Sequence, residues 1–93
     1  MVDKSFSSTD KNFQMTFRNG YTISVVFGER SYSDQGETTA EVAAWHSKED
    51  HWLAFEEGAW KEVPDGRSAV LGYQTPDQVA ELIQALKNFQ LPY

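Results

Sequence analysis

Two runs of alternating apolar residues flank an Asn-Gly pair in the segment FQMTFRNGYTISVVF, residues 13–27. This alternation predicts the two strands of a β-hairpin, each with one apolar face. A two-residue loop of Asn19 and Gly20 would place Phe17 and Ile23 on opposite faces, because directly opposed residues share a face of the sheet. That loop would therefore split the apolar set.

A three-residue loop over residues 18–20 keeps the set together. It pairs Phe17 with Tyr21 and Met15 with Ile23. The apolar residues that then share one face are Phe13, Met15, Phe17, Tyr21, Ile23, Val25 and Phe27. Glycine at the last loop position can adopt the left-handed conformation of a G1 bulge. A one-residue slip in register would expose this apolar face to solvent. Each large side chain would then lose roughly 1.5–3 kcal/mol of burial free energy, so we expect the three-residue loop.

The C-terminal segment has the pattern of one capped amphipathic helix. Thr75 suits the N-cap, Pro76 suits the first helical position, and Gln78 completes a capping box. Apolar residues then recur at helical spacing: Val79, Leu82, Ile83, Leu86 and Phe89. We expect a helix over residues 75–89 that packs this stripe against a sheet.

Further strands are predicted between the hairpin and the helix. Residues 40–47 and 51–57 favour a second hairpin, residues 60–63 favour a short extra strand, and residues 68–74 are compatible with one more. Apolar residues on both sides of the second hairpin indicate a central position or an external cover. The expected fold is α+β, an antiparallel sheet of four or five strands with one C-terminal helix packed on one face.

Ninety-three residues provide room for one two-layer core. We expect a single domain over residues 1–93, with a loose arm over 1–11, the sheet and its loops over 12–74, and the helix over 75–89. The sequence contains no cysteine, which excludes disulfides and thiolate metal sites and suits the cytoplasm. It also has no apolar run of about 18 residues, so we expect no membrane span.

The sequence shows no recognisable catalytic constellation. His46 and His51 in HSKEDH match no zinc-ligand spacing, and Glu56 and Glu57 would face opposite sides of a strand. No G-x-S-x-G elbow, P-loop or dinucleotide-binding glycine pattern occurs. We therefore predict a protein without enzymatic activity, cofactor or bound metal.

The net charge of −6 bears on the class of partner. The eight Lys and Arg residues are scattered along the chain, whereas a phosphate-binding face usually clusters them. Direct nucleic-acid binding is therefore disfavoured. An acidic surface attracts a basic protein instead.

Two regions are candidate contact surfaces. Three tryptophans fall within residues 40–63, and exposed Trp and Tyr often anchor interfaces. Packing all three inside the domain is the equally weighted alternative. The polar loop over residues 28–39 is the second region, with a plain solvated connector as its alternative. The candidate protein-binding residues are Tyr32, Asp34, Glu37, Trp45, Trp52 and Trp60.

Three segments carry a family resemblance: KNFQMTFRNGYTISVVFG, TTAEVAAWHS and GYQTPDQVAELI. They resemble a set of short accessory proteins found in tailed bacteriophages and their hosts. The resemblance covers residues 11–86 and rests on fold-determining motifs, namely a hairpin, a strand and a capped helix. The chain departs from the set at Ser33, where a cysteine near Asp34 is expected. The resemblance implies a small cytoplasmic phage-encoded protein that binds and inhibits host machinery, and it assigns no catalytic or ligand residue.

Together these features favour a non-enzymatic protein-binding module, a phage-type accessory or counter-defence factor whose partner is a basic host or phage protein. One alternative is a homo-oligomer that sequesters a nucleotide-like ligand. Its ligand-binding residues would be Arg30, Tyr32, Trp45 and Trp52. A second alternative is a DNA mimic that inhibits a nucleic-acid enzyme through surface carboxylates. A homodimer with a structural role is the third.

Overall fold

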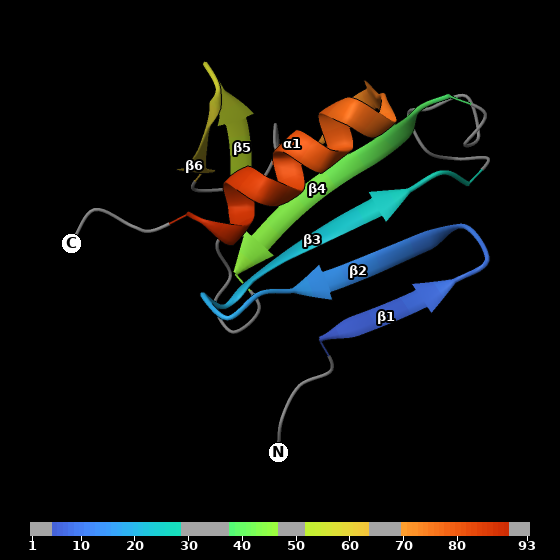
Figure 1. Ribbon diagram of the computed structural model, residues 1–93, viewed down its shortest axis with the longest axis horizontal. Helices are drawn as coiled ribbons and strands as arrows, with labels where there is room; N and C mark the ends of the chain where they lie inside the picture. The colour runs from blue at the N-terminus through green and yellow to red at the C-terminus, as the bar shows by residue number, and fades with distance from the viewer. Residues whose placement is uncertain (1–4, 29–37, 47–51, 64–69, 90–93) are drawn as a thin grey trace.

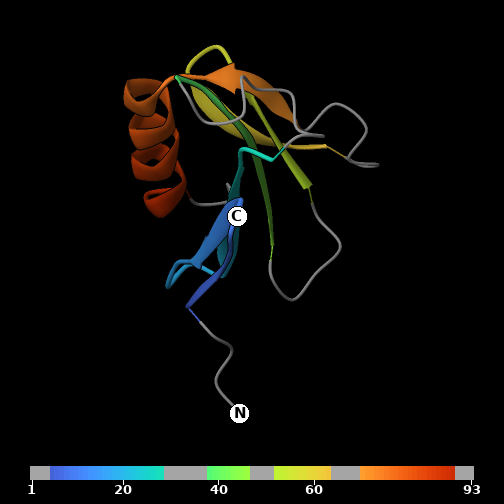
Figure 2. The same ribbon diagram turned by 90° about the vertical axis from the view of Figure 1, so that its right-hand side faces the viewer.

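The computed structural model describes residues 5–28, 38–46, 52–63 and 70–89. Within these residues the order of elements is β1 (Phe6–Thr9), β2 (Asn12–Thr16), β3 (Tyr21–Val26), β4 (Ala40–His46), β5 (Trp52–Glu56), β6 (Ala59–Val63), β7 (Leu71–Gln74) and α1 (Pro76–Lys87). All seven strands belong to one sheet with antiparallel pairing (Figure 1). The expectation of four or five strands is therefore wrong, and the fold is a sheet-dominated α+β fold with α1 on one side of the sheet (Figure 2).

The first additional strand is β1, which lies in the segment expected to be a loose arm, residues 1–11. Phe6 pairs with Met15 and Thr9 pairs with Asn12, so β1 extends the sheet beyond β2. All four residues of β1 are exposed, and the strand therefore lacks the apolar alternation that marks a half-buried strand. Backbone pairing with the edge of β2 stabilises this strand. Such pairing does not depend on an apolar pattern, so the sequence pattern does not reveal it.

The hairpin of β2 and β3 has the three-residue loop expected from its apolar alternation. Met15 faces Ile23, and the Phe17 N–H donates to the Tyr21 carbonyl oxygen at 2.9 Å. The Gly20 N–H donates to the Phe17 carbonyl oxygen at 3.0 Å, and Gly20 has a φ of 89°. The left-handed glycine thus closes the bulge, and the predicted register is confirmed.

Strand β4 is central in the sheet. One of its edges pairs with β3 from Glu41 to His46. Its other edge is divided: Ala40 and Val42 pair with β7, whereas Ala44 and Trp45 pair with β5. Figure 1 shows β5 and β6 at a steep angle to β2 and β3. The central position explains why β4 carries apolar residues on both faces.

Strands β5 and β6 form a tight hairpin. Glu56 pairs with Ala59, which leaves Glu57 and Gly58 as a two-residue loop. Both loop residues have positive φ, 52° and 80°, as a type I′ turn requires. Such a turn matches the right-handed twist of the two strands it joins.

Helix α1 begins with the expected capping box. The Gln78 N–H donates to Thr75 Oγ1 at 3.3 Å, and the Thr75 N–H donates to Gln78 Oε1 at 2.8 Å. The helix covers Pro76–Lys87, slightly less than the expected residues 75–89. At twelve residues it is too short to cross a bilayer, and no longer helix occurs in the described ranges.

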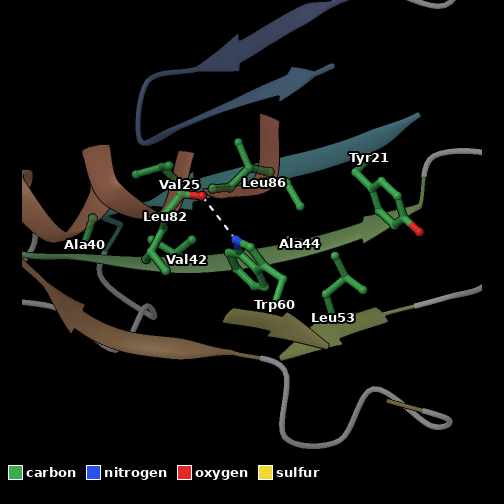
Figure 3. Packing of buried hydrophobic residues seen from close by; sticks show 10 residues of the cluster. Tyr21, Val25, Ala40, Val42, Ala44, Leu53, Trp60, Leu82 and Leu86 are labelled. Carbon is green, nitrogen blue, oxygen red and sulfur yellow. Dashed lines mark hydrogen bonds between the residues drawn. The ribbon is translucent and has the colours of Figure 1, made fainter. Parts of the chain in front are cut away.

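The hydrophobic core lies between α1 and the face of the sheet that the β2–β3 hairpin directs toward it (Figure 3). Leu82 and Leu86 of α1 are buried where the helix meets the sheet. On the strands, Ile23, Val42 and Leu53 are fully buried. Four apolar residues of the hairpin, Phe13, Met15, Phe17 and Phe27, pack around this core and stay partly buried. The predicted apolar face of the hairpin is thus the face that the helix covers.

Candidate functional site

Trp45 and Trp52 form a cross-strand pair where β4 ends and β5 begins. They lie directly opposite each other on β4 and β5. Their ring centroids are 5.1 Å apart and the ring planes are tilted by 48°. Both side chains are half-buried. The pair is therefore a rigid aromatic surface that is not sealed inside the protein.

The pair lies on the side of the sheet away from α1. Its neighbours along the strands, Ala44 and Leu53, are fully buried in the core beneath the helix. Because side chains alternate along a strand, Trp45 and Trp52 project from the other face. Figure 2 shows α1 on one side of the sheet. We call the opposite surface around Trp45 and Trp52 the tryptophan face.

Charged residues share the tryptophan face with the two indoles. By strand alternation, Glu41 of β4, Glu56 of β5 and Lys61 of β6 lie on this side. Among the described residues, two carboxylates and one ammonium group thus lie on the same side of the sheet as the indoles. This arrangement suits a partner that presents an apolar side chain next to basic residues.

Trp60, the third tryptophan among the predicted protein-binding residues, does not belong to this surface and is buried in the core. The side chain is 4% exposed, and its Nε1–H donates to the Leu82 carbonyl oxygen at 3.1 Å (Figure 3). The ring also packs edge-to-face on Phe55, with centroids 5.2 Å apart. Trp60 faces the helix and fills the core. The short strand around it carries no apolar alternation that would have revealed its side.

The other candidate residues of the predicted interface lie outside the described residues: Arg30, Tyr32, Asp34 and Glu37. The contribution of the loop over residues 28–39 therefore stays a prediction. Of the six proposed protein-binding residues, the structure brings two together, Trp45 and Trp52.

His46 has a packing role. Its ring lies edge-to-face on the buried Tyr21, with centroids 4.9 Å apart, at the end of β4. Its Nε2 would lie 2.8 Å from a Cβ placed on Gly20. No three His, Asp or Glu side chains of the described segments come together as a metal site. His51 lies outside those segments.

No known family model, curated protein or solved structure matches this chain. The resemblance to phage accessory proteins stays a prediction.

A second feature, which sequence reasoning missed, is a pocket of about 350 Å³ on the helix side of the sheet. The hairpin lines it with Phe13, Val25 and Phe27, and α1 lines it with Val79 and Ile83. We call it the helix–hairpin pocket. All five residues belong to the apolar stripes that predict the core, so the sequence shows their common side but not the gap between them.

Polar residues line one end of the helix–hairpin pocket. Thr38 and Thr39 immediately precede Ala40, and Gln74 pairs with Ala40 across the β4–β7 ladder. The Gln74 side-chain amide donates to the Gly72 carbonyl oxygen at 2.9 Å, which restrains its position. The pocket thus combines apolar walls with one polar end.

Proposed function

We propose that this protein is a non-enzymatic protein-binding module that docks a partner on its tryptophan face. The proposal rests on one observation, the cross-strand pair of half-buried indoles on the side of the sheet away from the helix. Tryptophan is enriched among the residues that dominate binding energy at interfaces. A pair held on two central strands loses little conformational entropy on binding.

The charge of the protein supports a basic partner. Of the charged residues that the structure describes on the tryptophan face, Glu41 and Glu56 are acidic and Lys61 is basic, and the whole chain carries a net charge of −6. The partner would pack an apolar or aromatic side chain against the exposed surface of the two indoles and place Lys or Arg residues around it. Such peripheral charges raise the association rate and are screened by salt, whereas the buried anchor is not.

The resemblance to accessory proteins of tailed phages suggests the biological context of this binding activity, namely infection of a bacterial host. In that setting the module is a counter-defence factor, and its partner is a bacterial host protein that it inhibits. The distribution of the described carboxylates favours this protein-binding activity over DNA mimicry. Glu41 and Glu56 lie on the tryptophan face, whereas Asp77 and Glu81 are exposed on α1, so these acids do not form one stripe.

The proposal is tested by affinity capture from bacterial lysate at low and moderate salt, followed by titration of the captured protein. Trp45→Ala and Trp52→Ala are each expected to raise the dissociation constant at least tenfold. This expectation follows from the loss of a central aromatic anchor. Circular dichroism and urea unfolding establish that each variant is folded at the assay temperature.

Trp60→Phe is the matched control, because it changes a tryptophan of the core and leaves the tryptophan face intact. It is expected to lower stability while the dissociation constant stays within about twofold. Two results would overturn the proposal. One is that no stoichiometric protein is captured at either salt concentration, and the other is that the Trp45→Ala/Trp52→Ala double variant binds as tightly as the wild type.

A further inference from the structure

The helix–hairpin pocket is a hollow in a region that otherwise has the packing of a core. Leu82 and Leu86 of α1 are buried, whereas Val79 and Ile83, which line the pocket, are half-buried. Native interiors contain few voids larger than a water molecule. The helix–hairpin pocket is not such a void but a hollow open to the surface, because Pro76 and Ala80 of its lining are exposed. Its volume of about 350 Å³ falls at the lower end of the range of small-molecule pockets, about 300–1,000 Å³.

Small side chains account for the space. Ala40, at the start of β4, and Ala80, on the helix, both line the pocket with short side chains. Larger residues surround them, including Phe13 and Phe27 from the hairpin. An apolar ligand that enters this space removes those aromatic and aliphatic groups from water, which favours binding.

Among the described residues, those that line the pocket include no charged side chain. The helix N-terminus, which often binds anions, is already occupied by its own capping box. The Thr75 and Gln78 N–H groups bond to the side chains of that box, and Pro76 has no N–H. Asp77 in the first turn adds a negative charge. The site is therefore unsuited to a carboxylate or phosphate, and its complement is an uncharged molecule.

We propose that the helix–hairpin pocket binds a small uncharged amphiphile, a compact apolar body with one hydroxyl or amide group. The apolar body lies between Phe13, Phe27 and Ile83, and the polar group meets the end formed by Thr38, Thr39 and Gln74. This activity is separate from the proposed protein binding, because the pocket and the tryptophan face are on opposite sides of the sheet.

The test uses the full chain and N-phenyl-1-naphthylamine, an uncharged dye whose fluorescence rises in apolar surroundings. We expect saturable binding of one dye per chain. We also expect 1-octanol to displace it and octanoate, which has the same chain length but a negative charge, to be at least tenfold weaker. Absence of saturable binding, or octanoate competing as well as 1-octanol, would overturn the assignment.

Ala80→Leu fills the pocket from a solvent-exposed helix position and is expected to weaken dye binding at least tenfold. Gln84→Leu is the control, because it adds the same side chain to α1 at an exposed position that does not line this pocket. It is expected to change the affinity less than twofold. Equal effects of the two substitutions would reject the location.

Amide chemical-shift mapping of the wild type with 1-octanol tests the location without a substitution. Shifts centred on Phe13, Val79 and Ile83 support the proposal, and shifts centred on Trp45 and Trp52 contradict it. Sedimentation provides a further check. A wild-type dimer that Ala80→Leu converts to a monomer would show that a second copy of the chain fills the groove, and this result would also overturn the proposal.

Discussion

The side-chain amide of Asn19 donates a hydrogen bond of 2.8 Å to the backbone carbonyl oxygen of Leu86, 67 positions further along the chain. The same Nδ2 donates to the Phe89 carbonyl oxygen at 3.1 Å, while Oδ1 accepts from the Tyr21 N–H at 3.1 Å. The last carbonyls of a helix lack partners within the helix. One turn residue of the β2–β3 hairpin therefore caps the C-terminus of α1 and ties the helix to the sheet.

Removing this cap is expected to destabilise the protein. Asn19→Ala loses the amide donor and should lower the free energy of unfolding by about 1–2 kcal/mol, measured by urea denaturation. Asn19→Asp keeps the acceptor for the Tyr21 N–H but places a carboxylate against carbonyl oxygens, so it should be at least as destabilising. Asn88→Ala is the control, because that amide makes an exposed bond of 3.2 Å to the Gln84 carbonyl oxygen within the helix. Equal losses for Asn19→Ala and Asn88→Ala would contradict the tertiary role.

Two glycines with positive φ allow the cost of backbone strain to be measured separately from the cost of steric contact. Gly20 and Gly58 have φ values of 89° and 80°. A Cβ on Gly20 would lie 2.8 Å from His46 Nε2, whereas a Cβ on Gly58 would meet nothing within 4 Å. Gly58→Ala should therefore show the conformational cost alone, roughly 1–2 kcal/mol. Gly20→Ala should cost at least about 1 kcal/mol more in urea unfolding, because the His46 ring must also move. Similar losses of unfolding free energy for the two variants would show that the His46 ring moves aside without a measurable cost.

Trp60 and Trp52 should respond differently to the same substitution. Trp60→Phe leaves a smaller ring in the core and removes the bond to the Leu82 carbonyl oxygen, at about 1–3 kcal/mol of unfolding free energy. Trp52→Phe changes a half-buried ring on the opposite face and should cost less than about 1 kcal/mol. Urea unfolding of the two variants in parallel measures the difference. A larger loss for Trp52→Phe would mean that Trp52 is the structural residue.

The β5–β6 turn offers a stabilising substitution. Glu57 has a φ of 52°, a conformation that glutamate adopts at a cost and asparagine adopts readily. Glu57→Asn creates the Asn-Gly pair that type I′ turns prefer and should raise the unfolding free energy by about 0.5–1 kcal/mol. Glu56→Asn, one residue earlier in β5, removes the same charge and should not stabilise. A gain from Glu56→Asn as large as that from Glu57→Asn would attribute the effect to charge alone.

Several features of the fold follow from the sequence alone because they depend on neighbouring residues. The hairpin register follows from the period of two in β2 and β3 together with a glycine that closes a three-residue loop. The start of α1 follows from Thr75, Pro76 and Gln78, whose contacts lie within one helical turn. In both cases a slip by one residue exposes apolar groups or loses a cap, and the local pattern therefore determines the structure.

The other features of the fold depend on contacts between segments that are far apart in the sequence. Strand β1 exists because the edge of β2 pairs with a segment whose side chains are all exposed, and Trp60 is a core residue because α1 lies over its side of the sheet. The pocket beside Ala40 and the cap that Asn19 provides likewise depend on where the helix packs on the sheet. Periodicity and turn chemistry describe how a segment folds on itself. Edge pairing, burial and capping across the chain depend on which surfaces meet, and only the tertiary structure determines that.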